Sequence, residues 1–302
     1  MRLSFRQRHS DTVELINDFK TLVSAIEPKA AHVTVAKSAH ENVREQLRVD
    51  KESKEAHKDT FLSGSYARST AINDINDVDV ICLLDLNQSI TPPEMVLAWI
   101  QAILSRYYTV IKRQGRSVGV QAAKDVWVDI VPSTPIASDA GPIWIPDREA
   151  HEWVASHPKG QIAAAVNQNK ATNGYYVQVV KLLKFWRDRL PREACRPKSY
   201  ILETLVYRTI GYPTSHAGAV VNVLEGIERT YGVFRKTNTV PSIVDPGYPS
   251  VNVAKRWTSS EFDEFMTQVQ SAAVVARQAL DQTAEATSRV LWRRLFGNGF
   301  GQ

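Results

Sequence analysis

Three aspartates stand in apolar stretches that alternate like β-strands, where carboxylates are uncommon. Asp77 and Asp79 are separated by one residue in "DVDVICLL". On a strand, their side chains point to the same face, about 7 Å apart. Asp129 lies between Val128 and Ile130 in a later strand-like stretch. If the two strands are neighbours, three carboxylates converge on one patch, and their mutual repulsion raises their pKa values.

A divalent metal ion would neutralise such a cluster. Hard cations such as Mg²⁺ bind a few carboxylate oxygens and leave other positions for water and substrate phosphates. Two such ions can hold the attacking and leaving oxygens of an in-line displacement on phosphorus. The catalytic and metal-binding candidates are therefore Asp77, Asp79 and Asp129. Each acid alone has a plainer interpretation, as part of a polar strand edge or as a buried, hydrogen-bonded side chain.

A phosphate-binding turn is predicted upstream of the acids, in "SGSYARST". Gly64 has no side chain, so the backbone can approach a phosphate closely, and Ser65 is expected to open a helix as its N-cap. The N–H groups at that helix N-terminus would face an anion. A Gly-Ser turn before a helix is commonplace. Followed by Asp77, Asp79 and Asp129, it becomes a far more specific pattern, which indicates metal-assisted phosphate chemistry.

A basic segment in the second half of the chain is a candidate anion-binding surface. Its charged residues are Lys181, Lys184, Arg187, Arg189, Arg192, Arg196 and Lys198, opposed only by Asp188 and Glu193. Such a cluster raises the local concentration of anions, and the chain as a whole carries a net charge of +5. The alternative is a solvated helix face, and the two interpretations stay open until an anion is placed nearby.

The elements that position these residues follow from hydrophobic periodicity and from helix-breaking residues. The first part of the chain is expected to contain helices over about residues 11–28 and 30–55, a strand over 78–84, a helix beginning at Pro92, and two strands ending near 135. After a loop-rich connection, the pattern is helical to the end. The short, glycine-rich tail "FGNGFGQ" is expected to be mobile. The sequence thus predicts two domains: a catalytic lobe with the N-terminal helices (1–160) and a helical nucleotide-binding lobe (161–302).

Composition and length place the chain among globular proteins. Its 302 residues are enough for two domains, and 43% hydrophobic with 23% charged residues is ordinary for a soluble protein. No run approaches the roughly 18 apolar residues of a membrane span, and the N-terminus lacks the apolar core of a signal peptide. Cys82 and Cys195 are too few for a disulfide framework or a structural zinc site. We therefore expect a cytoplasmic protein without membrane association.

The motifs together resemble the DNA polymerase β-like nucleotidyltransferase superfamily: Gly64-Ser65, "DVDV" at 77–80 and "VDI" at 128–130. The segments "VKLLKFWRD" and "PKSYILETL" resemble the helical lobe of the branch that holds oligoadenylate synthase, cyclic GMP-AMP synthase and the bacterial CD-NTases. The closing "LWRRLFGNGF" is similar to the end of many CD-NTases, and the match covers roughly residues 61–300. Two distant cysteines exclude the zinc insertion of vertebrate members, which favours the bacterial enzymes.

The resemblance implies an α+β fold. It consists of a polymerase β-like nucleotidyltransferase core, with a mixed sheet flanked by helices, and a C-terminal helical lobe of the oligoadenylate synthase type, with the active site in the cleft between them. In this branch a helical lysine and a serine before a tyrosine hold the donor triphosphate, and the tyrosine can stack on a base. Those positions fall on Lys184, with Lys181 one turn earlier, and on Ser199 and Tyr200. Tyr200 is equally typical of a helix core.

The implied activity is a nucleotidyltransferase that uses two Mg²⁺ ions, or Mn²⁺, to make a cyclic di- or trinucleotide second messenger from NTPs, ATP among them. The implied setting is bacterial anti-phage (CBASS) signalling. The implied partners are an effector that senses the product, and a regulator that is either of the HORMA type or conjugates the C-terminus; nucleic acid is not required. Two alternatives are a transferase that acts on an RNA end, a small molecule or a protein, and an inactive nucleic-acid-binding relative. The presence of all three acids argues against the inactive relative.

Overall fold

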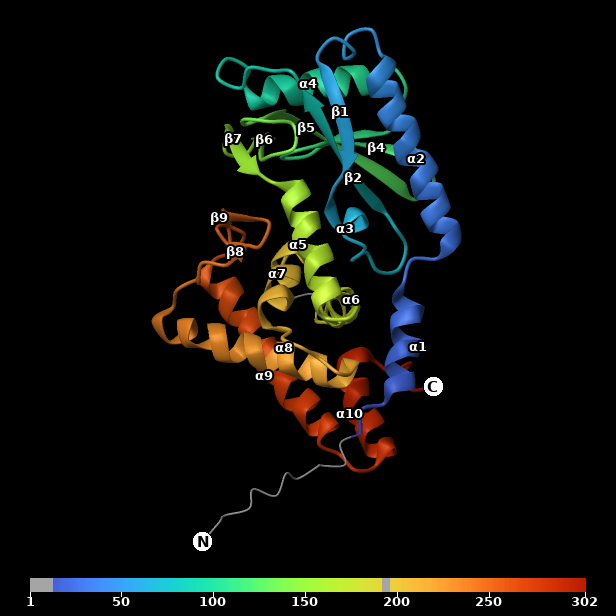
Figure 1. Cartoon of the computed structure of the whole chain (residues 1–302), viewed down its shortest axis with the longest axis vertical. Coiled ribbons are helices and arrows are strands. Elements are labelled where there is room, and N and C mark those ends of the chain that lie inside the picture. Colours follow the sequence, from blue (N-terminus) through green and yellow to red (C-terminus); the bar gives the residue numbers. More distant parts are fainter. Residues whose placement is uncertain (1–12, 192–195) are drawn as a thin grey trace. The chain divides into compact units, whose positions relative to one another are not determined.

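The computed structural model describes residues 13–191 and 196–302. They form two compact units, each assembled from segments that are distant in the sequence (Figure 1). The unit called here the sheet unit comprises Ile26–Lys170 and Ser242–Lys255. The helical unit comprises Ala171–Pro241 and Arg256–Gln302, together with residues 13–25, as far as the structure describes them. Packing therefore divides the chain discontinuously, and the functional division at residues 160 and 161 stays a prediction.

A seven-stranded mixed sheet is the centre of the sheet unit. Its strands are β1 (His57–Leu62), β2 (Asp77–Leu84), β3 (Ile111–Arg113), β4 (Val118–Ala123), β5 (Val126–Pro135), β6 (Ile143–Asp147) and β7 (Glu152–Ser156). The order is β1-β2-β5-β4-β3, and β6 continues from β5 to β7. Only the β2–β5 pair among these strands is parallel. The predicted mixed sheet is thereby confirmed.

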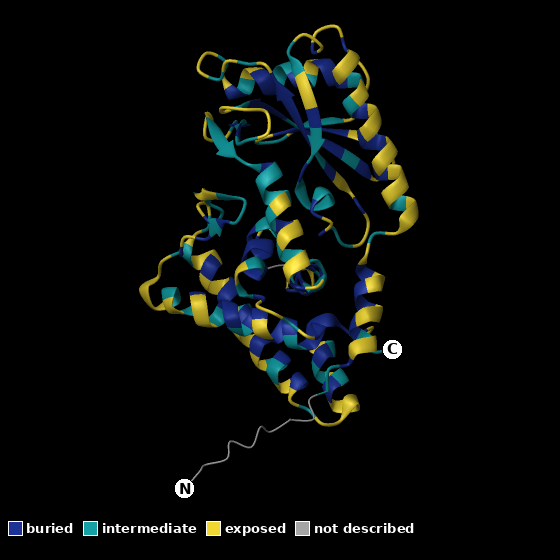
Figure 2. Ribbon diagram, in the orientation of Figure 1, coloured by how far each residue is buried: buried dark blue, intermediate teal, exposed yellow. Residues whose placement is uncertain are grey.

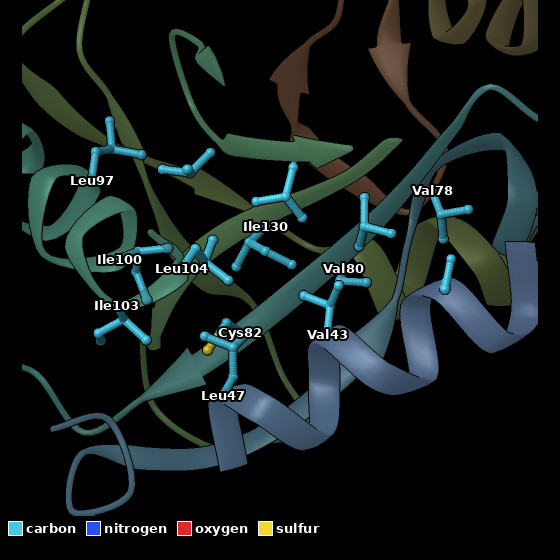
Figure 3. Close-up of a cluster of buried hydrophobic side chains, with 14 of the residues drawn as sticks. Val43, Leu47, Val78, Val80, Cys82, Leu97, Ile100, Ile103, Leu104 and Ile130 are labelled. Carbon is cyan, nitrogen blue, oxygen red and sulfur yellow. The ribbon is translucent and has the colours of Figure 1, made fainter. Parts of the chain in front are cut away.

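Two helices, α2 (Ala30–Val49) and α4 (Pro93–Leu104), contribute to the hydrophobic core on one face of this sheet. Side chains alternate between the faces of a strand. Val78 and Val80 of β2 and Ile130 of β5 accordingly join Val43 and Leu47 of α2 in the core (Figure 3). Figure 2 shows the result as buried central strands beside a helix α2 whose outer side is exposed. By the same alternation, the odd-numbered side chains of β2 and β5 point to the opposite face of the sheet.

Three smaller elements complete the sheet unit: α3 (Gly64–Ala67), α5 (Pro158–Ala171), and a hairpin of β8 (Val244–Asp245) and β9 (Tyr248–Asn252). The hairpin packs on the first turn of α5, although more than 80 residues separate them. Nε2 of Gln161 donates a hydrogen bond to Oδ2 of Asp245 (2.6 Å), and Nδ1 of His157 is hydrogen-bonded to the carbonyl oxygen of Gly247 (3.0 Å). These contacts explain why a segment from the helical half of the sequence belongs to the sheet unit.

The helical unit is built from α1 (Ile16–Ile26), α6 (Tyr175–Asp188), α7 (Ser199–Thr209), α8 (His216–Tyr231), a 3₁₀ helix (Gly232–Thr237), α9 (Ser259–Leu280) and α10 (Glu285–Phe296). An aromatic cluster joins the first helix to the last. The ring of Phe19 in α1 lies 5.0 Å from the ring of Trp292 and 5.0 Å from that of Phe300, edge to face. Edge-to-face contacts of this kind are favourable for buried aromatic rings.

The C-terminal tail is ordered, so the expectation of a mobile tail was wrong. Phe300 is 1% exposed within the aromatic cluster. The guanidinium of Arg293 donates hydrogen bonds to the carbonyl oxygens of Phe300 (2.8 Å) and Gly301 (3.1 Å). The glycines of the tail suggested mobility, but burial of one aromatic ring and these hydrogen bonds hold the segment against α10.

Three further elements differ from the sequence-based expectations. The first of the two strands expected before residue 135 is a hairpin of β3 and β4, closed by a hydrogen bond from Gln114 N to Ser117 O (2.9 Å). The loop-rich connection contains the β6–β7 hairpin, and the part of the chain expected to be helical to the end is interrupted by the β8–β9 hairpin. None of the helices in residues 13–191 and 196–302 combines the length and the apolar character that a membrane crossing needs.

Candidate active site

Asp79 and Asp129 are direct partners on neighbouring strands. In the parallel β2–β5 pair, the register places Asp79 opposite Asp129 and Asp77 opposite Trp127. Side chains at paired positions lie on the same face of a sheet, and this is the face away from the α2 core. Asp129 is 7% exposed, whereas Asp77, the first residue of β2, is exposed. The structure therefore brings two of the predicted acids together and places the third at the strand end.

Gly64 lies directly against the carboxylate of Asp79. Its backbone is in the left-handed region (φ +67°), and a Cβ atom at this position would lie 1.8 Å from Oδ2 of Asp79. A hydrogen bond from Ser63 N to Asp79 O (2.9 Å) ties the turn to β2. Only glycine is compatible with both the positive φ and the space beside the acid. The predicted Gly-Ser turn is therefore packed against the predicted acid pair.

Ser65 lies in the first turn of α3, and Ser63 is the N-cap residue of that helix. The prediction that Ser65 caps the helix was therefore wrong. The helix begins at Gly64, two residues earlier than an N-cap at Ser65 implies. Ser65 still contributes to the local structure, because its carbonyl oxygen accepts a hydrogen bond from Thr70 N (2.9 Å).

Burial and like charge raise the pKa values of both facing carboxyl groups. For Asp79 the pKa rises from 3.8 to about 6, mainly because burial penalises the ionised form, and then because of repulsion by Asp129 and Asp77. The guanidinium of Arg68 opposes this shift. For Asp129 burial again raises the pKa, while a hydrogen bond from Gln114 and the charge of Lys112 lower it. Negative charge at this site is thus only partly compensated by the protein.

The carboxylates of this site have the donor chemistry that a divalent cation needs. Within the part of the chain that the structure describes, no three His, Cys, Asp or Glu side chains are gathered closely enough to form a ready-made metal site. The donor chemistry nevertheless fits, because Asp79 and Asp129 offer hard carboxylate oxygens from adjacent positions, and burial, followed by repulsion between carboxylates, raises the pKa of both. Asp77 is the third oxygen donor on the same face of β2.

The predicted nucleotide-binding residues lie in the helical unit, on α6 and α7. Lys184 is buried, and its Nζ forms an ion pair with Oε1 of Glu203 (2.7 Å), which links the two helices. Lys181, one turn earlier, is also buried. Ser199 is the first residue of α7, and its Oγ accepts a hydrogen bond from Arg187 (3.0 Å).

The remaining predicted residues are less enclosed. Tyr200 is partly buried on α7, so its side chain is not a fully enclosed part of the helix core. Within the basic segment, Arg187 is bound to the carbonyl oxygen of Pro197 (3.1 Å) as well as to Ser199, and it supports the start of α7. Arg192 and Glu193 lie outside the described residues.

Sequence reasoning missed four residues beside the predicted ones: Arg68, Lys112, Gln114 and Glu203. Arg68 belongs to the segment "SGSYARST", and its position four residues after Gly64 was a signal that it could lie near the predicted phosphate-binding turn. In the structure Arg68 is buried, with 8% of its surface exposed. The other three carry no local signal. Their roles depend on strand register or helix packing, which neither composition nor spacing reveals.

A mixed sheet with a Gly-Ser turn packed on paired strand aspartates is the fold and site of a nucleotidyltransferase. A family model described as SMODS, the Second Messenger Oligonucleotide or Dinucleotide Synthetase domain, matches residues 13–169. The cyclic AMP-AMP-AMP synthase of Acinetobacter sp. (strain ATCC 27244 / 9458) is 36% identical over 294 residues, which cover 93% of this chain and 84% of the relative. The chain belongs to this family of bacterial CD-NTases, as its motifs implied, and the prediction of a nucleotidyltransferase is confirmed.

Solved structures with the same fold support the predicted fold class. The structure of E. coli MS115-1 CdnC with ATP has a TM-score of 0.78 at 17% identity, covering 95% of this chain and 99% of that chain. The structure of the E. coli MS115-1 CdnC:HORMA-deltaN complex has a TM-score of 0.77 at 18% identity, covering 95% and 98%. The predicted fold class, a nucleotidyltransferase core with a helical lobe, is confirmed.

Proposed function

We propose that this enzyme joins three AMP units, taken from ATP, into a cyclic AMP-AMP-AMP second messenger. The observation that carries the proposal is the 36% identity to a cyclic AMP-AMP-AMP synthase over 93% of the chain. The pairing of Asp79 with Asp129 beside Gly64 supports it, since the family's chemistry needs carboxylates and a phosphate-binding turn at one place. We further propose that the product acts in anti-phage signalling in the bacterial cytoplasm, as the family implies.

The chemistry is a series of in-line phosphoryl transfers. In each one a ribose hydroxyl loses its proton and forms a bond to the α-phosphorus of an NTP, while the bond from that phosphorus to its bridging oxygen breaks and pyrophosphate leaves. We assign Asp77, Asp79 and Asp129 to hold two Mg²⁺ ions, or Mn²⁺, beside Gly64 and Ser65 as phosphate contacts. When bound, such ions neutralise phosphate charge and activate the attacking hydroxyl. The aspartates orient the reacting groups, and positioning supplies much of the rate.

We assign Lys181, Lys184, Ser199 and Tyr200 to the donor nucleotide, in keeping with the family. Lys184 is already paired with Glu203 (2.7 Å), so its contribution to phosphate binding depends on this pair. Ser199 is held by Arg187, which fixes the first turn of α7 and with it the hydroxyl that would contact a phosphate. Tyr200 is the proposed stacking platform for a base.

We propose an activating HORMA-type partner, because the CdnC structure that shares this fold was solved in a complex with HORMA-deltaN. A downstream effector that senses the cyclic product is proposed from the family alone. A regulator that conjugates the C-terminus is likewise proposed from the family alone.

The test is product analysis by mass spectrometry after incubation with Mg²⁺ and either ATP alone or all four NTPs. We expect a phosphatase-resistant product with the mass of three cyclised AMP units, formed from ATP alone. A mixed-base ring in the four-NTP reaction would contradict the base assignment. A product formed only when an RNA end, a small molecule or a protein is added would contradict cyclisation. The reactions are repeated with a HORMA-type protein, because relatives can require activation.

The double substitution Asp77→Asn with Asp79→Asn is expected to abolish the product, because it removes the carboxylates proposed to bind both ions. The matched control is Asp74→Asn in the exposed loop before β2, where Asp74 only pairs with Nδ1 of His32 (3.0 Å). We expect this control to retain wild-type turnover. Unchanged turnover in the double variant would overturn the metal-site assignment.

A further inference from the structure

One row of side chains crosses four strands of the sheet on the face of the acids. Register places Asp79 opposite Asp129, Asp129 opposite Gly119, and Gly119 opposite Lys112. Paired positions share a face of the sheet, so the row runs from the acid pair to the edge strand β3. The two acids at one end of the row are the proposed metal ligands. The other end has no role in the mechanism described above.

Gln114 reaches Asp129 from the turn after β3. Its Nε2 lies 2.8 Å from Oδ1 and 2.8 Å from Oδ2 of Asp129. The amide nitrogen is the only donor of this side chain, so it must be the end that meets the carboxylate. The turn itself is fixed by the hydrogen bond from Gln114 N to Ser117 O (2.9 Å). A donor anchored in this way restricts rotation of the carboxylate about its side chain.

Gly119 provides the space that this arrangement needs. A Cβ atom at position 119 would lie 2.4 Å from Oδ1 of Asp129 and 2.8 Å from Cε of Lys112. The side chains of Asp129 and Lys112 therefore both lie over Gly119, from the strands on either side of it. Any larger residue would push the carboxylate away from its present orientation.

Lys112 places a positive charge beside the same carboxylate. Its Nζ lies 4.0 Å above the ring of Trp127, which is two residues before Asp129 and opposite Asp77 in the register. A cation over an aromatic face is attracted by the ring, so the amine is held on this face of the sheet. Its charge lowers the pKa of Asp129.

We propose that Gln114 is a positioning residue that holds the carboxylate of Asp129 in the orientation in which it takes up a divalent cation. The inference rests on the proposed function, because it takes Asp129 as a metal ligand. A ligating carboxylate that is itself hydrogen-bonded is oriented before the ion arrives, and loss of such an outer partner typically costs about 10- to 100-fold in metal affinity or activity. Gln114, in the turn after the edge strand β3, thus sets the metal affinity of a site whose ligands lie on the central strands β2 and β5.

The experiment measures Mn²⁺ binding by the full chain without nucleotide, by titration under electron paramagnetic resonance, together with the Mg²⁺ dependence of turnover. Gln114→Met keeps the length of the side chain and removes the donor, and Gln114→Glu keeps the shape and replaces the donor by a negative charge. Lys112→Met removes the cation. The matched controls are Gln121→Met on β4 and Lys124→Met in the turn before β5, both at exposed positions. Thermal midpoints establish that each variant is folded.

We expect Mn²⁺ binding at least tenfold weaker in Gln114→Met, with a raised Mg²⁺ requirement and near-normal turnover once Mg²⁺ is saturating. Gln114→Glu should be more impaired than Gln114→Met. Lys112→Met should bind Mn²⁺ at least as tightly as wild type, because it removes a positive charge that repels the ion and leaves the hydrogen bonds of Gln114 in place, and both controls should match wild type. A role in packing alone predicts instead that the isosteric Gln114→Glu behaves like wild type. That result, or unchanged Mn²⁺ binding in Gln114→Met, overturns the inference.

Asp129→Asn is measured in parallel to separate two kinds of failure. If wild type binds Mn²⁺ and Asp129→Asn does not, the metal site stands, and the Gln114 variants alone decide the inference. If Asp129→Asn binds Mn²⁺ as tightly as wild type, the proposed metal role of Asp129 fails, and the inference that rests on it fails as well.

Discussion

Asp79 and Asp129 face each other as like charges on neighbouring strands, and Arg68, Lys112 and Gln114 relieve that repulsion only in part. A catalytic site that binds cations needs this imbalance, because full compensation by the protein would remove the attraction for the ion. Burial of partly uncompensated charge lowers the free energy of unfolding of the protein.

We predict that Asp79→Asn stabilises the metal-free protein at pH 7.5. A carboxyl group whose pKa is raised from 3.8 to about 6 binds its proton more tightly in the folded than in the unfolded state. It therefore opposes folding above about pH 6, and the penalty disappears as the pH falls below 4. The gain is on the order of 2–3 kcal/mol, from about two pKa units.

The measurement is urea unfolding in EDTA at pH 7.5 and pH 4. The variant should exceed wild type at the higher pH and approach it at the lower. Asp74→Asn, at an exposed position, is the control and should follow wild type at both. Equal stabilities of wild type and Asp79→Asn at pH 7.5 would show that the carboxylate carries no such penalty.

At the scale of single elements, one turn and one ion pair position the candidate residues. The turn into α3 brings Gly64 onto Asp79, and the ion pair of Lys184 with Glu203 joins α6 to α7. The position of the turn depends on the positive φ of Gly64, and the joint between α6 and α7 depends on a buried pair of opposite charges. Neither feature tolerates much change.

We predict that Gly64→Ala lowers turnover more than 100-fold. The new Cβ would lie 1.8 Å from Oδ2 of Asp79, and φ is +67°, so the turn must move or the carboxylate must turn away. Gly299→Ala is the control, because a Cβ there meets nothing within 4 Å. The check is steady-state product formation, and a Gly64→Ala enzyme with wild-type turnover would contradict the close packing of turn and acid.

We predict that Glu203→Gln destabilises the protein by about 3–5 kcal/mol, since it leaves the buried Lys184 without its charged partner. The double variant Lys184→Met with Glu203→Leu should recover much of this loss, because both charges of the pair are removed together. Thermal and chemical unfolding of the single and double variants measure the coupling. Additive losses would mean that the two groups do not act as a pair.

The double variant also tests the role of Lys184 in nucleotide binding. If Lys184 serves donor phosphate, the recovered protein should bind ATP more weakly than wild type. If the pair is only structural, ATP affinity should return together with stability. Lys198→Met, at an exposed position just before α7, controls for the loss of one positive charge.

On the scale of the whole molecule, the helical unit packs its first described helix against the last helix and the C-terminal residues. Phe19 of α1 makes edge-to-face contacts with Trp292 of α10 and Phe300 of the tail, and Nε of Arg289 is bound to Oδ2 of Asp18 (2.7 Å). The Arg289–Asp18 hydrogen bond joins residues that are 271 positions apart in the sequence. The tail is therefore part of the core of the unit.

We predict that Phe300→Ala destabilises the protein by about 3–5 kcal/mol, the usual cost of emptying a buried aromatic site. Removal of Gln302 alone, which is exposed, should leave stability unchanged. Circular dichroism melting curves distinguish the two. A Phe300→Ala protein as stable as wild type would restore the interpretation of this segment as a free tail.

The sequence by itself determined the chemical class of this protein. Phosphoryl transfer restricts which residue types can do the work, so Gly64, Asp77, Asp79 and Asp129 were recognisable from type and spacing. Periodicity predicted most helices and the central strand, because burial of one face imposes a repeat of 2 or about 3.6 residues. The mixed sheet and the nucleotidyltransferase class followed from the resemblance of these motifs to a known superfamily.

Only the tertiary structure decided which residues surround those acids. The parallel register of β2 and β5 sets Asp129 beside Asp79, and the edge strand brings Gln114 and Lys112 to it across Gly119. These three residues are of ordinary types in an ordinary hairpin. Strand pairing joins segments through backbone hydrogen bonds that are nearly independent of side-chain identity. Which residues lie beside Asp129 is therefore set by strand register, and the residues next to them in the sequence give no sign of it.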